Sequence, residues 1–230
     1  MRNVRPASRT RYRRRHTWSS ALAAVVASGW LTFGPALAQT PVIVPVEKEP
    51  QHREVFRNAV LALLDVRFPP GYTSLFHTHS NDNVSVRIAT GPTRIDTLQE
   101  QGSEQTALVG RVVFNSATPP YTHRVANLGT SLIRILDIEI LATAPTPTTL
   151  ATDDLARHEV IVDNPRVRIS RIVLDTNEHL TNHTHPRGWL TTVVRGYPGP
   201  GEYFWQEAGS QARPVEGGPG GTERVEIEVK

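Results

Sequence analysis

Most of the chain beyond residue 40 follows a pattern in which hydrophobic and polar positions alternate. The period of two is clearest at residues 84–88, 138–140 and 225–229, and it places the apolar side chains of each segment on one face of a strand. Glycine and proline separate these segments, as at residues 69–71 and 198–201. Short strands with regular turn signals predict an all-β fold of the sandwich, jelly-roll or barrel type.

The chain contains an internal duplication. Similar tetrapeptides, His-Arg-Glu-Val and Arg-His-Glu-Val, stand at residues 52–55 and 157–160, and the tripeptide His-Thr-His occurs at 77–79 and again at 183–185. An asparagine lies 19 residues before each tripeptide, at Asn58 and Asn164. The shared order and spacing of these features predict two tandem domains of the same fold.

A segment rich in Thr, Pro and Ala at residues 142–152 separates the two repeats. It has no charge and no periodic apolar pattern, which is typical of a linker. The predicted organisation is therefore a first domain at 39–141, a linker at 142–152 and a second domain at 153–230.

The first 38 residues have the three parts of a secretory signal peptide. An arginine-rich region is followed by an uncharged apolar run and by Ala-Leu-Ala at residues 36–38, which predicts cleavage before Gln39. Pro35 interrupts the apolar run, and the run is shorter than the roughly 20 residues of a membrane span. The expected location is periplasmic or secreted, with the twin-arginine route, an uncleaved anchor and a mitochondrial transit peptide as alternatives.

The net charge and the absence of cysteine limit the classes of binding partner and of metal ligand. The whole chain has a formal charge of +3, but its first 38 residues hold seven of the 25 Lys and Arg and none of the 22 Asp and Glu, so the remainder carries −4. A mildly acidic mature protein predicts no nucleic-acid partner and, after signal cleavage, no membrane partner. Because there is no cysteine, any metal ligand must be His, carboxylate or water.

Histidines of the first repeat form the clearest candidate site. His77 and His79 are two residues apart, so on a strand they project from the same face and can converge on one cation. A Pro-Gly pair six residues before His77 and a further histidine, His123, on a later predicted strand strengthen this interpretation.

These residues resemble the two sequence motifs of the cupin family. The first motif, G-x5-H-x-H-x3,4-E-x6-G, is matched at Gly71, His77, His79 and Gly91. The second motif, G-x5-P-x-G-x2-H-x3-N, is matched at its ends by Gly110, His123 and Asn127. Two extra residues around Pro119-Pro120 displace the histidine of the second motif, and its central Pro and Gly are absent.

The resemblance implies two tandem cupin jelly-roll β-barrels, with one divalent metal ion in the first barrel bound by His77, His79 and His123. The glutamate ligand of the family should fall at Asn83 or Val84, and neither is anionic. The predicted site is therefore a neutral three-histidine site, similar to that of cupin dioxygenases without the carboxylate. Imidazole ligands suit several metals, so Fe, Zn, Mn, Ni and Cu are not distinguished.

The second barrel is expected to be degenerate. His183 and His185 are present, with His179 as a candidate third ligand, but Trp189 and Ala212 stand where the family pattern has Glu and His. Two imidazoles hold a divalent ion poorly, which favours a structural role and one metal ion per chain.

Other residues of the two repeats are expected to play no direct part in metal binding. His52 and His158 occupy equivalent places, which predicts a structural role at the barrel rim. Arg87 and Arg124 flank the first site in sequence. Arg124 is expected to face outward, and Arg87 is expected to face away from His79 if no bulge intervenes, so neither is assigned as a substrate clamp.

Two classes of function fit these observations. One is a three-histidine, dioxygenase-like enzyme acting on a small chelating molecule with a non-haem metal. The other is a non-catalytic periplasmic protein that binds a metal or small ligand, in which the second barrel adds stability or a homodimer surface. Cupin folds host many functions, so the fold does not decide between them.

Overall fold

A computed structural model of the chain describes residues 40–145, 157–212 and 214–230. The predicted signal peptide at 1–38 and most of the predicted linker at 142–152 lie outside the described residues. Within those residues, strands dominate, and the short 3-10 helix η1 (Val46–Lys48) is the one helical element. No helix of the described part of the chain is long and apolar enough to span a membrane.

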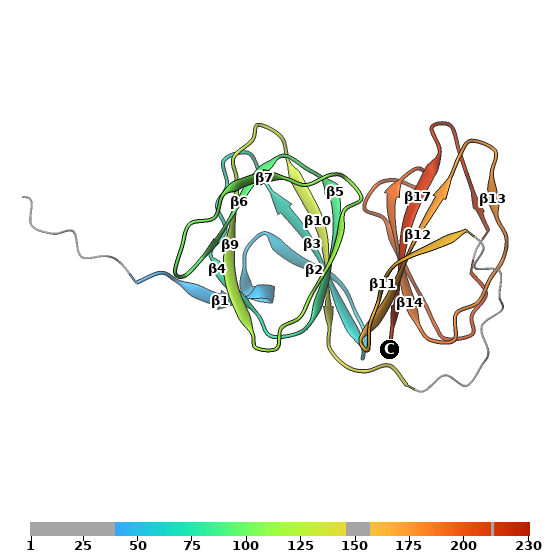
Figure 1. The fold of residues 1–230 in the computed structure, drawn as a ribbon, viewed down its shortest axis with the longest axis horizontal. Helices are drawn as coiled ribbons and strands as arrows, with labels where there is room; N and C mark the ends of the chain where they lie inside the picture. The colour runs from blue at the N-terminus through green and yellow to red at the C-terminus, as the bar shows by residue number, and fades with distance from the viewer. Residues whose placement is uncertain (1–39, 146–156, 213) are drawn as a thin grey trace, which may run out of the picture. The chain divides into compact units, whose positions relative to one another are not determined.

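The first barrel is built from two five-stranded sheets that face each other (Figure 1). One sheet has the order β1 (Ile43–Pro45), β4 (Phe76–His79), β9 (Tyr121–Asn127), β6 (Pro92–Thr97) and β7 (Glu104–Thr106). The other has the order β2 (His52–Arg57), β3 (Leu61–Phe68), β10 (Ile133–Ile140), β5 (Asn83–Ala89) and β8 (Val112–Asn115).

The second barrel repeats one of these sheets and reduces the other. Its five-stranded sheet has the order β11 (His158–Asp163), β12 (Val167–Leu174), β17 (Thr222–Val229), β14 (Trp189–Arg195) and β15 (Tyr203–Gln206). Among the described residues, the facing sheet consists of β13 (His179–Leu180) and β16 (Val215–Glu216). The prediction of an all-β chain with two jelly-roll barrels is confirmed.

Strand β5 shows how the alternating pattern positions the site. Val84, Val86 and Ile88 point into a hydrophobic core, while the intervening residues Asn83 and Ser85 line a cavity inside the first barrel. Because side chains alternate along a strand, β5 has one apolar face and one polar face. The polar face of β5 lines the interior of the barrel, which also holds apolar side chains such as Val66 and Phe68.

One hydrophobic core is shared by the sheet that contains β3, β10 and β5 in the first barrel and the five-stranded sheet of the second barrel. Leu61, Leu136 and Ile138 of the first half and Ile169 and Ile227 of the second belong to the same cluster of buried side chains. Accordingly, residues Thr40–Lys230 form one compact unit. Burial of apolar surface is the main favourable term in folding, so the two halves stabilise each other.

Leu136 tests this core, because its side chain is fully buried on β10. We expect Leu136→Ala to lower the free energy of unfolding by about 2–5 kcal/mol through lost burial and a residual cavity. The matched control is Leu132→Ala, because Leu132 is 42% exposed and surface changes cost only about 0.5 kcal/mol. Urea denaturation measures both, and equal losses would contradict the assignment of the core.

Candidate metal centre

Three histidines of the first barrel meet on adjacent strands of one sheet. His77 and His79 project from β4, and the Cα partner of His77 on β9 is His123. The Nε2 atoms of His77 and His123 are 3.0 Å apart, and candidate ligand atoms of all three rings lie within 4.8 Å of one another. The structure thus brings together the three residues that the sequence proposes as ligands.

Hydrogen bonds to Nδ1 orient two of these rings. His77 Nδ1 donates to the carbonyl oxygen of Leu75 at 3.0 Å, and His79 Nδ1 donates to Glu139 Oε1 at 2.7 Å. A proton on Nδ1 leaves the Nε2 lone pair free to bind a cation. Metal-binding histidines are commonly held in this way by a carbonyl or carboxylate.

The donor set fits a divalent metal ion. Two ligands about 2.1 Å from one ion and at right angles to each other lie about 3.0 Å apart, close to the spacing of His77 and His123. Burial and then the neighbouring His52 lower the pKa of His77 to about 3, and burial with His77 and His79 nearby lowers the pKa of His123 well below its usual value. Both rings are therefore neutral at pH 7, as metal binding requires.

His79 has a different electrostatic environment. Burial alone would lower its pKa, but the hydrogen bond that His79 donates to Glu139 and the charges of Asp137 and Glu139 outweigh burial and raise it. The carboxylates therefore make the His79 ring more basic, and a more basic imidazole is a better ligand.

Of the two positions proposed for the missing carboxylate, Asn83 is the one at the site. Its Nδ2 lies 2.6 Å from His79 Nδ1 and donates to Tyr121 Oη at 2.7 Å, while its Oδ1 accepts from Asn115. Val84 is buried in the hydrophobic core on the opposite face of β5. The carboxylate nearest to the histidines comes instead from β10, where Glu139 is the Cα partner of Asn83.

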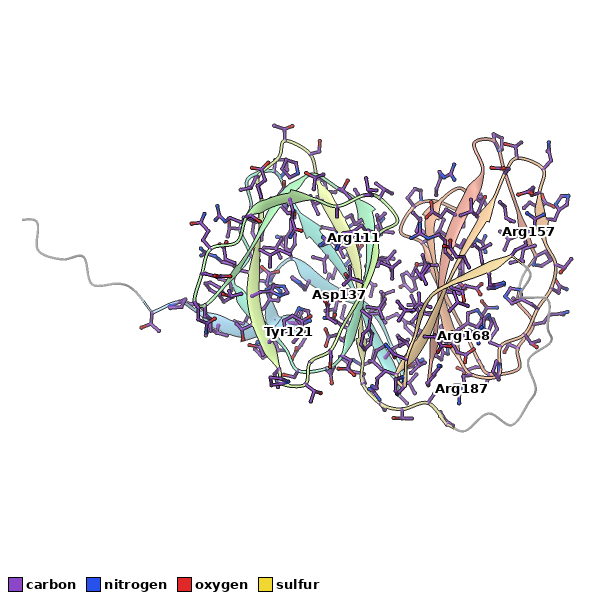
Figure 2. The ribbon with its side chains drawn as sticks, viewed as in Figure 1. Arg111, Tyr121, Asp137, Arg157, Arg168 and Arg187 are labelled. Atoms are coloured by element: carbon purple, nitrogen blue, oxygen red, sulfur yellow. The ribbon has the colours of Figure 1, made fainter. Side chains whose placement is uncertain are left out.

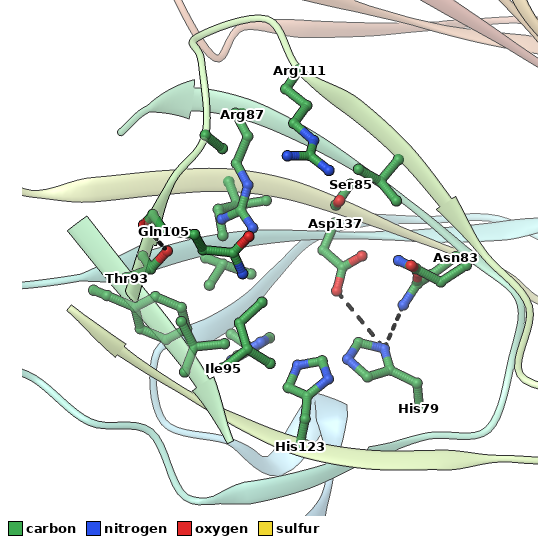
Figure 3. Close-up of a pocket in the computed structure, with 18 of the residues that line it drawn as sticks. His79, Asn83, Ser85, Arg87, Thr93, Ile95, Gln105, Arg111, His123 and Asp137 are labelled. Atoms are coloured by element: carbon green, nitrogen blue, oxygen red, sulfur yellow. Dashed lines mark hydrogen bonds and ion pairs between the residues drawn. The ribbon is translucent and has the colours of Figure 1, made fainter. Parts of the chain in front are cut away.

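A cavity of about 290 Å³ lies beside the histidines. Figure 3 shows Arg87 and Arg111 at the end of the cavity away from His79 and His123. Tyr121 on β9 and Asp137 on β10 approach it from the two facing sheets (Figure 2). The cavity therefore has imidazoles at one end and guanidinium groups at the other.

Two polar atoms of the cavity wall have no hydrogen-bond partner among the described residues: Arg87 Nε and Asp137 Oδ1. Burial lowers the pKa of Arg87 and raises the pKa of Asp137 to about 6. A buried donor or acceptor without a partner is costly, and a bound ligand can satisfy it.

The structure places Arg87 inside the first barrel, so its expected orientation away from His79 was wrong, whereas the outward orientation expected of Arg124 agrees with the structure. Arg87 follows Asn83 and Ser85 on the same face of β5 and so points into the barrel. Arg124 Nε donates to Asp96 at 2.9 Å, and its side chain is 38% exposed.

Solved structures share this architecture. A salicylate 1,2-dioxygenase from Pseudaminobacter salicylatoxidans has 10% sequence identity and a TM-score of 0.54, with 78% of this chain and 76% of that chain covered. YhhW from Escherichia coli has 14% identity and a TM-score of 0.53, with 78% and 89% covered. A cupin domain from Bordetella pertussis has 27% identity and a TM-score of 0.36 over 41% of this chain and 98% of that domain.

The fold is the cupin fold. The prediction of an all-β fold of the cupin jelly-roll type is thereby confirmed. No protein-family model and no curated protein sequence matches the chain.

In the second cupin barrel, the structure brings together a different set of residues from the predicted one. His183 and His185 are buried and approach Glu226 of β17, together with His158 of β11. His179, the candidate third ligand, lies outside this group: it is exposed on β13, where its Cα partner is Glu216. Trp189 is fully buried, with its ring 4.4 Å from that of His185.

Sequence reasoning missed the buried carboxylates of both cupin barrels. Asp137 and Glu139 stand on the polar face of β10, and Glu226 and Glu228 stand on the polar face of β17. Their alternation with isoleucine and valine was visible in the sequence. It is the pattern of a strand with one solvated face, so it did not indicate that these carboxylates lie inside a barrel.

Glu139 gives a direct test of how the first site is oriented. We expect Glu139→Gln, which removes the charge beside His79 but keeps the side-chain shape, to weaken metal binding about 10- to 100-fold. Glu104→Gln, on the exposed strand β7, is the matched control. Competition with a chelator measures both affinities, and identical values would show that Glu139 does not support a metal ligand.

Proposed function

We propose that the first cupin barrel binds one divalent metal ion through His77, His79 and His123, and that this site binds and transforms a small chelating anion. The observation that carries the proposal is the cavity, with His79 and His123 at one end and Arg87 and Arg111 at the other, and with His77 Nε2 3.0 Å from His123 Nε2. When bound, a divalent ion held by neutral imidazoles keeps its full charge and can polarise an oxygen atom of a chelating ligand.

The cavity wall indicates the class of ligand. Arg87 and Arg111 are suited to pair with a carboxylate, because a guanidinium offers several donors in one plane. The unpaired Oδ1 of Asp137 can accept a hydrogen bond from a ligand hydroxyl. The volume of about 290 Å³ is at the lower end of the range for small-molecule sites. These features favour a small hydroxycarboxylate.

The proposed activity is that of a dioxygenase-like enzyme. Salicylate, which the name of one solved neighbour identifies as that enzyme's substrate, carries a carboxylate beside a hydroxyl and is a suitable first probe. A non-catalytic protein that sequesters a metal or small ligand would use the same cavity. Oxygen consumption by the metal-loaded protein separates the two, because the binding protein would retain the probe without consuming oxygen.

Substitution of Arg87 tests the ligand class. We expect Arg87→Gln to weaken binding of salicylate to the metal-loaded protein by about 10- to 100-fold, the cost of one charge-assisted hydrogen bond. Arg124→Gln is the matched control, because Arg124 pairs with Asp96 outside the cavity. Calorimetric titration measures both. An unchanged affinity in the Arg87 variant would argue against an anion at this end of the cavity.

We also propose that the protein is exported and that its mature form begins at Gln39. The support is the arginine-rich leader followed by an apolar run and Ala-Leu-Ala at residues 36–38. The intact mass of protein recovered from the periplasm or medium of its host should correspond to residues 39–230. Recovery of a chain that retains the leader would contradict cleavage at this position.

A further inference from the structure

In the second barrel, three imidazoles surround one carboxylate oxygen. Oε2 of Glu226 lies 3.0 Å from His158 Nε2, 3.4 Å from His183 Nε2 and 2.9 Å from His185 Nε2. The four side chains are at most 8% exposed, and they come from β11, from the segment before β14 and from β17. Segments distant in sequence thus converge on one buried point.

Hydrogen bonding alone explains this arrangement poorly. A carboxylate oxygen has about two lone-pair directions, so three N–H donors exceed what Glu226 Oε2 can accept well. A divalent cation would use the Nε2 lone pairs and the carboxylate oxygen at the same time. The four ligand atoms lie within 4.8 Å of one another, which suits a four-donor metal site.

Contacts at Nδ1 orient two of these rings as in the first barrel. His183 Nδ1 donates to the carbonyl oxygen of Thr181 at 3.3 Å, and His185 Nδ1 donates to Glu228 Oε2 at 3.2 Å. Both rings therefore present Nε2 to the centre of the cluster.

The register of the strands explains how Glu226 reaches the cluster. In the first barrel Glu139 pairs with Asn83, which lies four residues after His79. In the second barrel Glu228 pairs with Trp189, which lies four residues after His185. Counting back two residues on the same face makes Glu226 the counterpart of Asp137.

The counterparts differ by one methylene group. The carboxylate of Asp137 stays 3.9 Å from His79 Nδ1, whereas that of Glu226 reaches three Nε2 atoms. The longer side chain therefore places a carboxylate among the imidazoles of the second barrel.

The fourth donor, His158, also has a counterpart, which is His52. The His52 ring lies 4.6 Å from that of His77, and the His158 ring lies 4.8 Å from that of His183. In the first barrel, His52 Nδ1 forms a hydrogen bond of 2.7 Å with Oε2 of Glu49. In the second, His158 directs Nε2 at Glu226, and its Nδ1 has no partner among the described residues.

We propose that the second barrel binds a divalent metal ion through His158, His183, His185 and Glu226. This site is independent of the one in the first barrel and replaces the expectation of a single ion per chain. The carboxylate cancels one of the two charges of the ion, so the site is suited to hold the metal tightly rather than to act as a strong Lewis acid.

Titration of the metal-free protein with Co(II), followed by its visible absorption, tests the proposal. We expect about two equivalents to bind the unaltered chain and about one to bind a His183→Gln, His185→Gln double variant. Glu226→Asp gives the second barrel the same residue that the first barrel has at the equivalent position, Asp137, so this variant should fold. We expect it to weaken one of the two equivalents about 10-fold or more, because the carboxylate is withdrawn from the imidazoles.

Glu223→Asp is the matched control, because Glu223 lies on the same strand but pairs with Arg171. It should leave both equivalents unchanged. His79→Ala should remove only the first-barrel ion, so failure of one site can be told from failure of the other. The proposal is overturned if no equivalent responds to Glu226→Asp, or if the only ion bound is lost in His79→Ala.

Discussion

The structure depends on pairs of strands that are apolar on one face and ionisable on the other. In β10 and β17, isoleucine, leucine and valine enter the common hydrophobic core while aspartate and glutamate turn into the barrels. Burial of the apolar faces stabilises the fold and forces the carboxylates inside. A buried carboxylate needs hydrogen bonds or a cation, and histidines on neighbouring strands supply the contacts.

With the same strand arrangement, the two barrels form different sites. In the first barrel, Glu139 accepts a hydrogen bond from His79 Nδ1, and Asp137 lines a cavity that can hold a ligand. In the second barrel, Glu226 enters the histidine cluster and Trp189 packs on His185. The same strand register thus yields two sites that differ in how closely a carboxylate approaches the histidines.

The parts of this arrangement that depend on local spacing could be predicted from the sequence. The shared face of His77 and His79 follows from their separation, and His123 follows from the resemblance to a second motif. The carboxylate partners and His158 could not be predicted, because they depend on which strand pairs with which. Arg87 was misplaced for a related reason: the pattern of β5 gives two faces, and only the packed structure shows that the polar face is the interior.

The most direct test of the central claim is anomalous X-ray diffraction from crystals of the wild-type protein grown with zinc. Zinc bound in the first barrel should give a strong peak about 2.1 Å from a nitrogen atom of each of His77, His79 and His123. A zinc peak elsewhere in the crystal, with no peak among these three histidines, would contradict the assignment of the metal site.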